Sequence, residues 1–388
     1  MSRNSFYDRL QVLEPEKQPL NQTERLRAIE RPLLAWYEQH ARILPWRDNP
    51  EPYFVWISEI MLQQTRVEAV KPYFHRFITA LPGVKELALV EEDRLLKLWE
   101  GLGYYNRARN LKKAAQMVME EYDGILPDSY EELKKLPGIG SYTAGAIASI
   151  AYGIPVPAVD GNVLRVISRV TGSREDILKQ SVKTNMEQQL LSVMPKDYAS
   201  SYNQGLIEIG AIVCVPNGAP LCDQCPLASI CIAKRDGLTG EIPVKTPKKP
   251  RKIENKTVFI LSLKDRFGIR KRKDSGLLAS LYELPNVEGH LTAEEAAKLL
   301  HVSLTNITPL NKAKHIFSHV EWHMTGYYVT LNDETLNDET LNAETLNHER
   351  LSDETFNHET DYLWVTPEEL KQTYSLPGAF LAYTKLIR

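Results

Sequence analysis

The stretch LPGIGSYTAG, from Leu136 to Gly145, decides how the first half of this sequence is expected to fold. The segments on either side, DSYEELKKL and SYTAGAIASIAYG, have the composition of two short helices joined by the glycine-rich turn. Glycine permits a tight turn and the close approach of a ligand, and it leaves amide N–H groups at the next helix N-terminus available to an anion. The stretch therefore predicts a clamp for a phosphate group. Taken alone, it also fits an ordinary corner between two helices.

Hydrophobic patterning divides the chain into two parts. From Glu24 to Ile232 it shows successive amphipathic helical patterns, with Gly and Pro between them and little alternation of period two. Residues 233–256 are rich in Lys, Arg and Pro and lack a core pattern, so we expect a basic linker. In 257–388, alternating segments such as VEWHMTGYYVTL indicate strands, and TPEEL indicates a capped helix. The sequence thus predicts an all-α part followed by a mixed α/β domain.

A five-residue repeat interrupts the α/β domain between Leu331 and Thr360. Its period matches neither a helix nor a strand, and one apolar residue in five cannot offset the entropy of ordering the segment. We expect 331–360 to be a solvated insertion between two strands, either an expanded loop without a catalytic role or a tail that binds a protein. The segment carries a net charge of −8, so the remainder is net +5 although the whole chain is −3. A positive remainder suits an anionic partner such as nucleic acid.

Neither a signal peptide nor a membrane span is evident in the sequence. The N-terminus, MSRNSFYDRLQVLEPEKQPLNQ, has no apolar stretch of signal-peptide length, and no later run reaches the length of about 18 apolar residues that a span requires. We therefore expect a cytoplasmic protein with no membrane partner, associated with the nucleoid if its source is bacterial.

All the cysteines of the chain lie in one short stretch, at Cys214, Cys222, Cys225 and Cys231. In an intracellular protein, such a cluster favours metal binding over a disulfide framework. A structural zinc site usually has two paired ligand elements, whereas this stretch has a single C-x-x-C. Four thiolates in one compact loop suit a 4Fe–4S cluster, and zinc is the alternative.

Two acidic residues lie in motifs that also have simpler explanations. Asp160 opens the corner VPAVDGNVLRV, in which Asp160 and Asn162 alone would indicate a helix cap or a turn. Glu59 lies in VWISEIMLQQTRV, and periodicity alone predicts a solvated charge on one face of an amphipathic helix.

In this order, LPWR, SEIMLQQTRV, LPGIGSYTAG, the Asp160 corner and the cysteine cluster resemble adenine DNA glycosylases of the MutY family, which belong to the helix-hairpin-helix base-excision superfamily. The resemblance covers nearly the whole chain beyond Thr23. It implies an all-α helix-hairpin-helix glycosylase region with an iron–sulfur loop at 24–232, a linker at 233–256 and a Nudix-like lesion-recognition domain at 257–388. The family usually has six residues between the first two cysteines where this chain has seven, and we expect a bulge to absorb the difference.

The resemblance implies a monomeric enzyme of base excision repair that removes adenine mispaired with 8-oxoguanine or guanine in double-stranded DNA. The target nucleotide is flipped out, Glu59 protonates a ring nitrogen of adenine, and Asp160 stabilises or attacks the oxocarbenium-like sugar. Asn162 and Tyr142 orient this pair. Relatives that also cut the strand carry a lysine at the position of Tyr142, and because a phenol cannot form a Schiff base, no efficient lyase step is expected.

Further site residues are implied by the same resemblance. Gly138 and Gly140 would hold the DNA backbone. The loop of Phe317, Ser318 and His319, by itself only a turn between strands, would recognise 8-oxoguanine. Trp46, Arg47 and Leu62 would line the pocket for the adenine, with Arg42 and Leu44 as further substrate-binding residues. Gln64 and Tyr104 would fill the space that the adenine leaves in the stack. The segment GLLASLYELPNVEGHLTAEEAAKLL lacks the Arg-Glu pattern that holds Mg²⁺ in Nudix hydrolases, so no pyrophosphate hydrolase is expected.

Two other classes of function stay open at this stage. One is a bifunctional glycosylase and lyase acting on oxidised pyrimidines, which Tyr142 and the second domain disfavour. The other is a non-catalytic DNA-binding iron–sulfur protein that uses the hairpin only as a clamp. The presence of both Glu59 and Asp160 argues against the second alternative.

Overall fold

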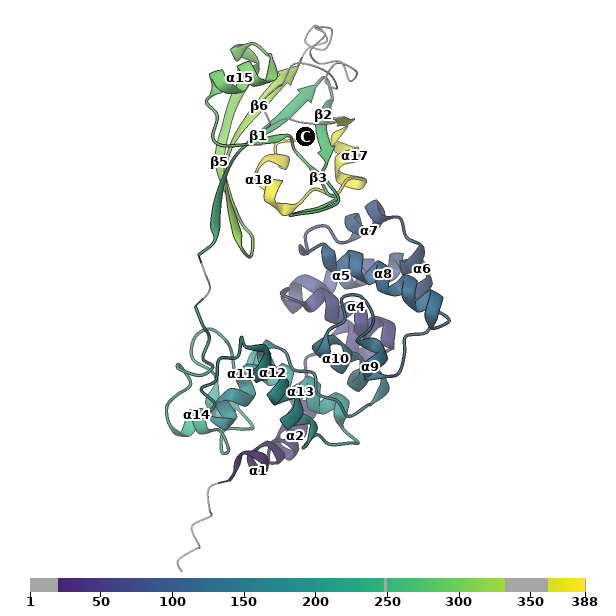
Figure 1. Ribbon diagram of the computed structural model, residues 1–388, viewed down its shortest axis with the longest axis vertical. Coiled ribbons are helices and arrows are strands. Elements are labelled where there is room, and N and C mark those ends of the chain that lie inside the picture. Colours follow the sequence, from purple (N-terminus) through teal and green to yellow (C-terminus); the bar gives the residue numbers. More distant parts are fainter. Residues whose placement is uncertain (1–19, 248–249, 332–361, 388) are drawn as a thin grey trace, which may run out of the picture. The chain divides into compact units, whose positions relative to one another are not determined.

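The computed structural model describes residues 20–247, 250–331 and 362–387 (Figure 1). By its contacts the chain divides into two compact units. The first comprises Met1–Val55, Asp128–Lys135 and Ile139–Thr246, and the second comprises Trp56–Pro127, Leu136–Gly138 and Pro247–Arg388. The predicted helical region is therefore shared between both units.

The regular elements in the described residues of the first unit are helices, beside one isolated β-bridge between Asp176 and Val244. Its helices are α1 (Gln22–Arg27), α2 (Glu30–His40), α3 (Pro45–Asp48), α9 (Tyr130–Leu133), α10 (Ser141–Tyr152), α11 (Gly161–Thr171), α12 (Gln180–Leu191), α13 (Ala199–Ile212), the 3₁₀ turn η1 (Cys222–Gln224) and α14 (Ile232–Arg235). Helix α13 is central, since it contacts α2, α10 and α11. Its side chains Tyr202, Leu206 and Ile209 are fully buried in one apolar cluster. Burying such side chains supplies most of the stability of a helical unit.

The second unit begins with helices, of which α4 is the most buried. These helices are α4 (Pro52–Leu62), which starts just before the unit, α5 (Val67–Ala80), α6 (Val84–Leu89), α7 (Glu92–Leu98) and α8 (Asn106–Glu121). Helix α8 contacts α6 and α7 through an apolar stripe that includes Leu111 and Val118. The ring of Trp99 is fully buried and meets Phe77 edge to face, with centroids 5.9 Å apart.

The C-terminal part of this unit is a mixed sheet. Its strands are β1 (Lys252–Leu263), β2 (Arg266–Lys271), β3 (Tyr282–Glu283), β4 (Asn286–Glu288), β5 (Ile307–Ile316), β6 (Val320–Leu331) and β7 (Leu363–Val365). The main path runs β3-β2-β1-β6-β5, with β4 paired to β1 and β7 to β2. Strands β1 and β6 are parallel and pair from Lys252↔Val320 to Leu263↔Leu331. Residues 252–256, which the sequence assigned to the linker, belong to β1.

Short helices cover both faces of the sheet (Figure 1). They are α15 (Ala293–Leu300), α17 (Pro367–Gln372) and α18 (Leu381–Thr384), with the 3₁₀ turns η2 (Leu304–Asn306) and η3 (Gly378–Phe380). Along β1, Val258 and Ile260 join one apolar cluster with Phe380 of η3, whereas Phe259 and Leu261 join another with α15. This alternation is the expected consequence of the two-residue period of a strand. The predicted order of a helical part followed by an α/β domain is confirmed.

The acidic repeat predicted as an insertion at 331–360 lies outside the described residues, apart from Leu331 at the end of β6. Across the described ranges, no helix combines the length and the apolar character that crossing a membrane requires.

Candidate functional site

The glycine turn predicted as a phosphate clamp lies between α9 and α10. Gly138 has a φ of +80°, and an added Cβ would stand 2.8 Å from the Cβ of Asn110. Both the left-handed backbone and the lack of space therefore demand glycine at this position. Gly140 is the N-cap of α10 and is exposed. The first amide groups of α10 thus begin at an exposed turn, as a site for an anion requires.

Asp160 and Asn162 form one hydrogen-bonded corner at the start of α11. Asp160 is the N-cap, and its Oδ1 accepts from the backbone N–H groups of Asn162 and Val163, both at 2.8 Å. Its Oδ2 accepts from Nδ2 of Asn162 at 2.7 Å. Burial raises the pKa of the Asp160 carboxyl above its ordinary value, and the hydrogen bonds to the charged form only partly oppose this effect. A carboxylate with a raised pKa and fixed geometry is typical of a functional site.

The corner continues through Arg165 towards the first cysteine. Nη2 of Arg165 donates to Oδ1 of Asn162 at 2.9 Å, and Nε donates to the carbonyl of Cys214 at 2.7 Å. The same Nη2 donates to the carbonyl of Gly210 at 2.6 Å. Helix α13 comes so close here that a Cβ at Gly210 would meet the Cβ of Asn162 at 2.5 Å. The side chain of Asn162 is therefore held by Asp160, by Arg165 and by the close backbone of Gly210.

Tyr142 and Glu59 lie on two different helices. Tyr142 is half-buried in the first turn of α10. Glu59 lies in the middle of α4 and is only 6% exposed, so the simpler explanation of a solvated charge does not hold. Leu62, at the end of the same helix, is half-buried. Almost every residue of α4 from Val55 onward is buried, which is why helical periodicity misplaced the face that carries Glu59.

Two arginines implied to contact adenine meet a carboxylate that the sequence analysis missed. Glu208 of α13 is fully buried, and its two oxygens accept from Nε of Arg42 at 2.6 Å and from Nη2 of Arg47 at 2.8 Å. Burial by itself raises the pKa of Glu208, but the two guanidinium groups outweigh burial and hold it below its ordinary value. Leu44 and Trp46, between the arginines, are buried. The structure therefore gathers all four predicted residues of 42–47 in one segment anchored to α13.

The two residues implied to fill the space in the stack share an unusual backbone. Gln64 has a φ of 58° and Tyr104 a φ of 47°, both in the left-handed region. Such conformations are rare for residues other than glycine and concentrate at functional sites. Gln64 is exposed, and Tyr104 keeps 48% of its surface exposed. Both side chains are thus available to a ligand.

The predicted lesion-recognition residues form the turn between β5 and β6. The ring of Phe317 packs edge-on against Trp322, with centroids 4.9 Å apart. Ser318 is exposed, and its Oγ lies 3.0 Å from the hydroxyl of Tyr104. The backbone carbonyl of His319 accepts from the N–H of Lys252 at 3.1 Å. The structure therefore brings Ser318 and Tyr104, which the sequence placed in separate roles, into contact.

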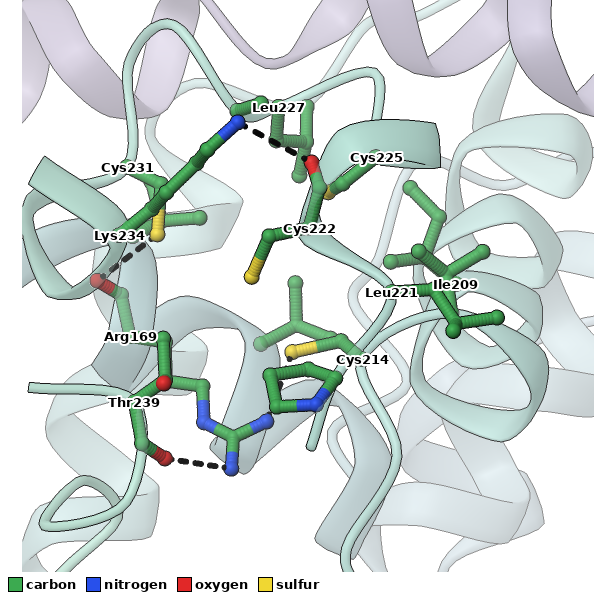
Figure 2. A pocket seen from close by; sticks show the side chains of 15 residues that line it. Arg169, Ile209, Cys214, Leu221, Cys222, Cys225, Leu227, Cys231, Lys234 and Thr239 are labelled. Carbon is green, nitrogen blue, oxygen red and sulfur yellow. Dashed lines mark hydrogen bonds between the residues drawn. The ribbon is translucent and has the colours of Figure 1, made fainter. Parts of the chain in front are cut away.

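The four cysteines, all free thiols, line a single pocket (Figure 2). Apolar side chains such as Ile209, Leu221 and Leu227 complete the lining. Nη1 of Arg169 donates to Sγ of Cys214 at 3.2 Å. Burial and the neighbouring thiols raise the pKa of Cys225 to about 11, so that without a metal this thiol is protonated at neutral pH.

Four thiolates can hold either a zinc ion or a 4Fe–4S cluster. In the part of the chain that the structure describes, no group of three or more His, Cys, Asp or Glu side chains is suited to hold one metal ion. A zinc ion needs all its thiolates about 2.3 Å away. A cluster places each thiolate on its own iron, so the thiolates stand further apart around one space. The seven residues between Cys214 and Cys222 form a loop closed by a 2.9 Å hydrogen bond from the N–H of Leu221 to the carbonyl of Val213.

Known proteins resemble both parts of the chain. Residues 57–192 match the family described as HhH-GPD superfamily base excision DNA repair protein, and residues 257–386 match the NUDIX domain family. An adenine DNA glycosylase of Buchnera aphidicola subsp. Acyrthosiphon pisum (strain APS) is 35% identical over 302 residues, which cover 77% of this chain and 85% of the relative. The adenine DNA glycosylase of Homo sapiens is 32% identical over 365 residues, covering 78% of this chain and 67% of the relative. The solved structure of a thermostable thymine-DNA glycosylase matches with a TM-score of 0.50 and 26% identity, covering 56% of this chain and 100% of that one.

Proposed function

Because this chain belongs to the adenine DNA glycosylases, and is thus a base-excision enzyme that hydrolyses an N-glycosidic bond, we propose that it removes adenine mispaired with 8-oxoguanine or guanine in double-stranded DNA. The reaction needs a base that is turned out of the duplex, a proton for the departing adenine and stabilisation of the sugar cation. We assign the proton donor to Glu59 and the stabilising or attacking carboxylate to Asp160.

The observation that carries this assignment is that two carboxyl groups are shielded from water, one of which, Glu59, periodicity would leave in solvent. Glu59 is 6% exposed, and burial raises the pKa of Asp160. Burying a carboxyl group is unfavourable unless the fold gains something specific from it, and carboxyl pairs in general acid and nucleophile roles are the usual reason in glycoside cleavage. Asn162 would keep Oδ2 of Asp160 directed, while the two backbone amides hold Oδ1.

The opposite base would be recognised by the turn of Phe317, Ser318 and His319. Ser318 is exposed, and a hydroxyl can both donate and accept a hydrogen bond, as the altered edge of 8-oxoguanine requires. The exposed turn of Gly138 and Gly140 would hold the phosphate backbone without reading the base sequence. The +5 charge of the chain outside its acidic repeat is consistent with a DNA partner.

We also propose that Cys214, Cys222, Cys225 and Cys231 hold a 4Fe–4S cluster. All four line one pocket, and four thiolates in one compact loop with a single C-x-x-C suit a cluster better than a zinc ion. When bound, the cluster would contribute folding free energy to the cysteine loop rather than take part in the cleavage. Arg169 would donate a hydrogen bond to the Cys214 sulfur, which favours the thiolate form.

The test is a single-turnover assay on duplexes of one sequence that place adenine opposite 8-oxoguanine, guanine or thymine. We expect excision from the first two and none from the third. Glu59→Gln should bind the 8-oxoguanine duplex as the wild type does yet release no adenine, because it keeps the shape of the side chain and removes the proton. Glu68→Gln, an exposed glutamate on α5, is the matched control.

Three outcomes would contradict the proposal. Excision at the wild-type rate by Glu59→Gln would refute the assignment of Glu59 as the proton donor. Equal rates opposite thymine and 8-oxoguanine would remove the mispair specificity, and a borohydride-trapped adduct of the wild type would favour the bifunctional alternative.

A further inference from the structure

Arg107 joins two segments that are far apart in the sequence. It lies in the first turn of α8 and is only 9% exposed. Its Nη1 donates to three carbonyls at the end of α4 and just beyond it, and its Nη2 donates to two carbonyls of the loop before α8. These acceptors are Ile60 at 2.7 Å, Met61 at 3.0 Å, Gln63 at 2.7 Å, Leu102 at 3.1 Å and Gly103 at 3.1 Å.

Each of these two segments ends in a residue with a left-handed backbone. Gln64 follows the acceptor Gln63, and Tyr104 follows the acceptor Gly103. The guanidinium carbon of Arg107 also lies 5.6 Å from the centroid of the Tyr104 ring. A left-handed conformation of a non-glycine residue persists only where its surroundings enforce it. Arg107 contacts both the residue before Gln64 and the residue before Tyr104.

The chemistry of arginine suits this position. The last carbonyls of a helix lack partners within the helix, and they carry the negative end of its dipole. Burial lowers the pKa of Arg107 to about 10, so the side chain is still charged at neutral pH. Its planar fork can reach two segments at once, whereas a lysine offers a single nitrogen to both.

We propose that Arg107 is a positioning residue for nucleotide extrusion: it presets Gln64 and Tyr104 in the conformations with which they enter the base stack. This inference rests on the proposed function, because only the resemblance to the adenine DNA glycosylases assigns Gln64 and Tyr104 to the base stack. Presetting lowers the entropy that must be lost when the wedge forms on DNA. Arg107 touches neither the base nor the sugar in this scheme, so its loss should act on opening the duplex and not on cleavage of the bond.

The experiment compares Arg107→Lys and Arg107→Met with Lys113→Met, which removes an exposed charge from the same helix. Two duplexes are used, one with adenine opposite 8-oxoguanine and one with adenine opposite an abasic site, where less stacking must be broken. Extrusion is followed by the fluorescence of 2-aminopurine in place of the target adenine, and excision by single-turnover rates. We expect Arg107→Lys to slow extrusion and excision, relative to the wild type, about tenfold on the fully paired duplex and about twofold or less opposite the abasic site. For Arg107→Met the loss on the paired duplex should exceed the loss opposite the abasic site by a larger factor.

Lys113→Met should leave the wild-type rates unchanged on both duplexes.

The outcomes separate this inference from the proposal beneath it. Equal losses on both duplexes, or an Arg107→Lys chain that no longer folds by circular dichroism, would assign Arg107 to stability and overturn the inference. If Gln64→Ala and Tyr104→Ala also act equally on both duplexes, the assignment of these side chains to the stack is what fails. If they act on the paired duplex alone while the Arg107 variants do not, only the role of Arg107 is refuted.

Discussion

Asn162 donates from Nδ2 to the Oδ2 of Asp160 across 2.7 Å, so an amide two residues further along the chain directs one oxygen of a partly desolvated carboxylate. The other oxygen is already taken by two backbone amides. Within this corner, only the side-chain hydrogen bond can be removed by substitution without changing Asp160 or the backbone.

Asn162→Ala should reduce adenine excision at neutral pH about 10- to 100-fold, the value of one hydrogen bond to a charged group. The pKa of Asp160 is already raised by burial, and losing a donor to the charged form raises it further. The acid side of the pH–rate profile should therefore shift to higher pH. Single-turnover rates between pH 5 and 8.5 test this, with the exposed Asn185→Ala as control. An unshifted profile would show that the contact does not set the ionisation of Asp160.

Glu208→Gln should lower the free energy of unfolding by about 2 kcal/mol or more at pH 7, because it leaves two arginines without their carboxylate. The pKa of Glu208 lies below its ordinary value of 4.5, so its contribution is fully present above pH 4.5 and is lost as pH falls through the lower, folded-state value. Urea denaturation should show a constant gap between wild type and variant from pH 7 to pH 5 and a shrinking gap below pH 4.5. Glu38→Gln, an exposed glutamate of α2, should show no gap. A gap that widens in acid would contradict the assignment.

Tyr142→Lys should introduce some strand cleavage, because an amine in the first turn of α10 could form a Schiff base with the sugar. Borohydride trapping of an enzyme–DNA adduct measures this directly. Tyr152→Lys, at the opposite end of the same helix, controls for adding an amine to α10. Absence of any adduct with the first variant, or equal adducts with both, would place Tyr142 away from the reacting sugar.

Ser318→Ala should reduce the preference for adenine opposite 8-oxoguanine over adenine opposite guanine several-fold, as expected for one neutral hydrogen bond. Replacing Phe317, Ser318 and His319 together should reduce it much more, and chiefly in binding rather than in the chemical step. Duplex affinities and single-turnover rates on the two mispairs measure the preference, with Ser303→Ala as an exposed control in the same domain. A triple variant with the full preference would mean that the turn does not recognise the lesion.

Cys225→Ser should remove the brown colour of a 4Fe–4S cluster and lower duplex affinity together, because one lost ligand releases the loop. Absorbance, iron content and binding to the 8-oxoguanine duplex provide the measurements. Ser229→Ala, an exposed neighbour in the loop, should change none of them. A purified wild type that is active without iron would refute the cluster.

The sequence analysis predicted features that depend on local chemistry. The turn at Gly138, the cap at Asp160 and the strand from Val320 to Leu331 all follow from neighbouring residues, and the structure contains each of them. These elements need no knowledge of distant partners, because a turn, a cap or an alternating strand is specified within a few residues.

The missed features depend on partners far along the chain. Glu208 lies 166 residues from Arg42, and Arg107 lies 47 residues from its acceptor Ile60. No local pattern marks a buried charge whose partners come from another helix or from backbone carbonyls. The burial of Glu59 was not predicted for a related reason. Almost every residue of α4 from Val55 onward is buried, and periodicity can identify a buried face only where a solvated face remains.

The parallel pairing of β1 with β6 has a consequence for synthesis of the chain. The hairpins β1–β2 and β5–β6 join strands that are close in sequence, but the twelve-residue β1 must wait for β6, which begins at Val320, before its other edge is covered. Contacts of such long sequence separation form late and slowly. A ribosome-bound chain would therefore expose β1, which from Val258 onward is apolar on both faces, until β6 has been made. Aggregation during expression should accordingly begin at β1, and a holding chaperone that covers this strand until β6 has been made should increase the yield of folded protein.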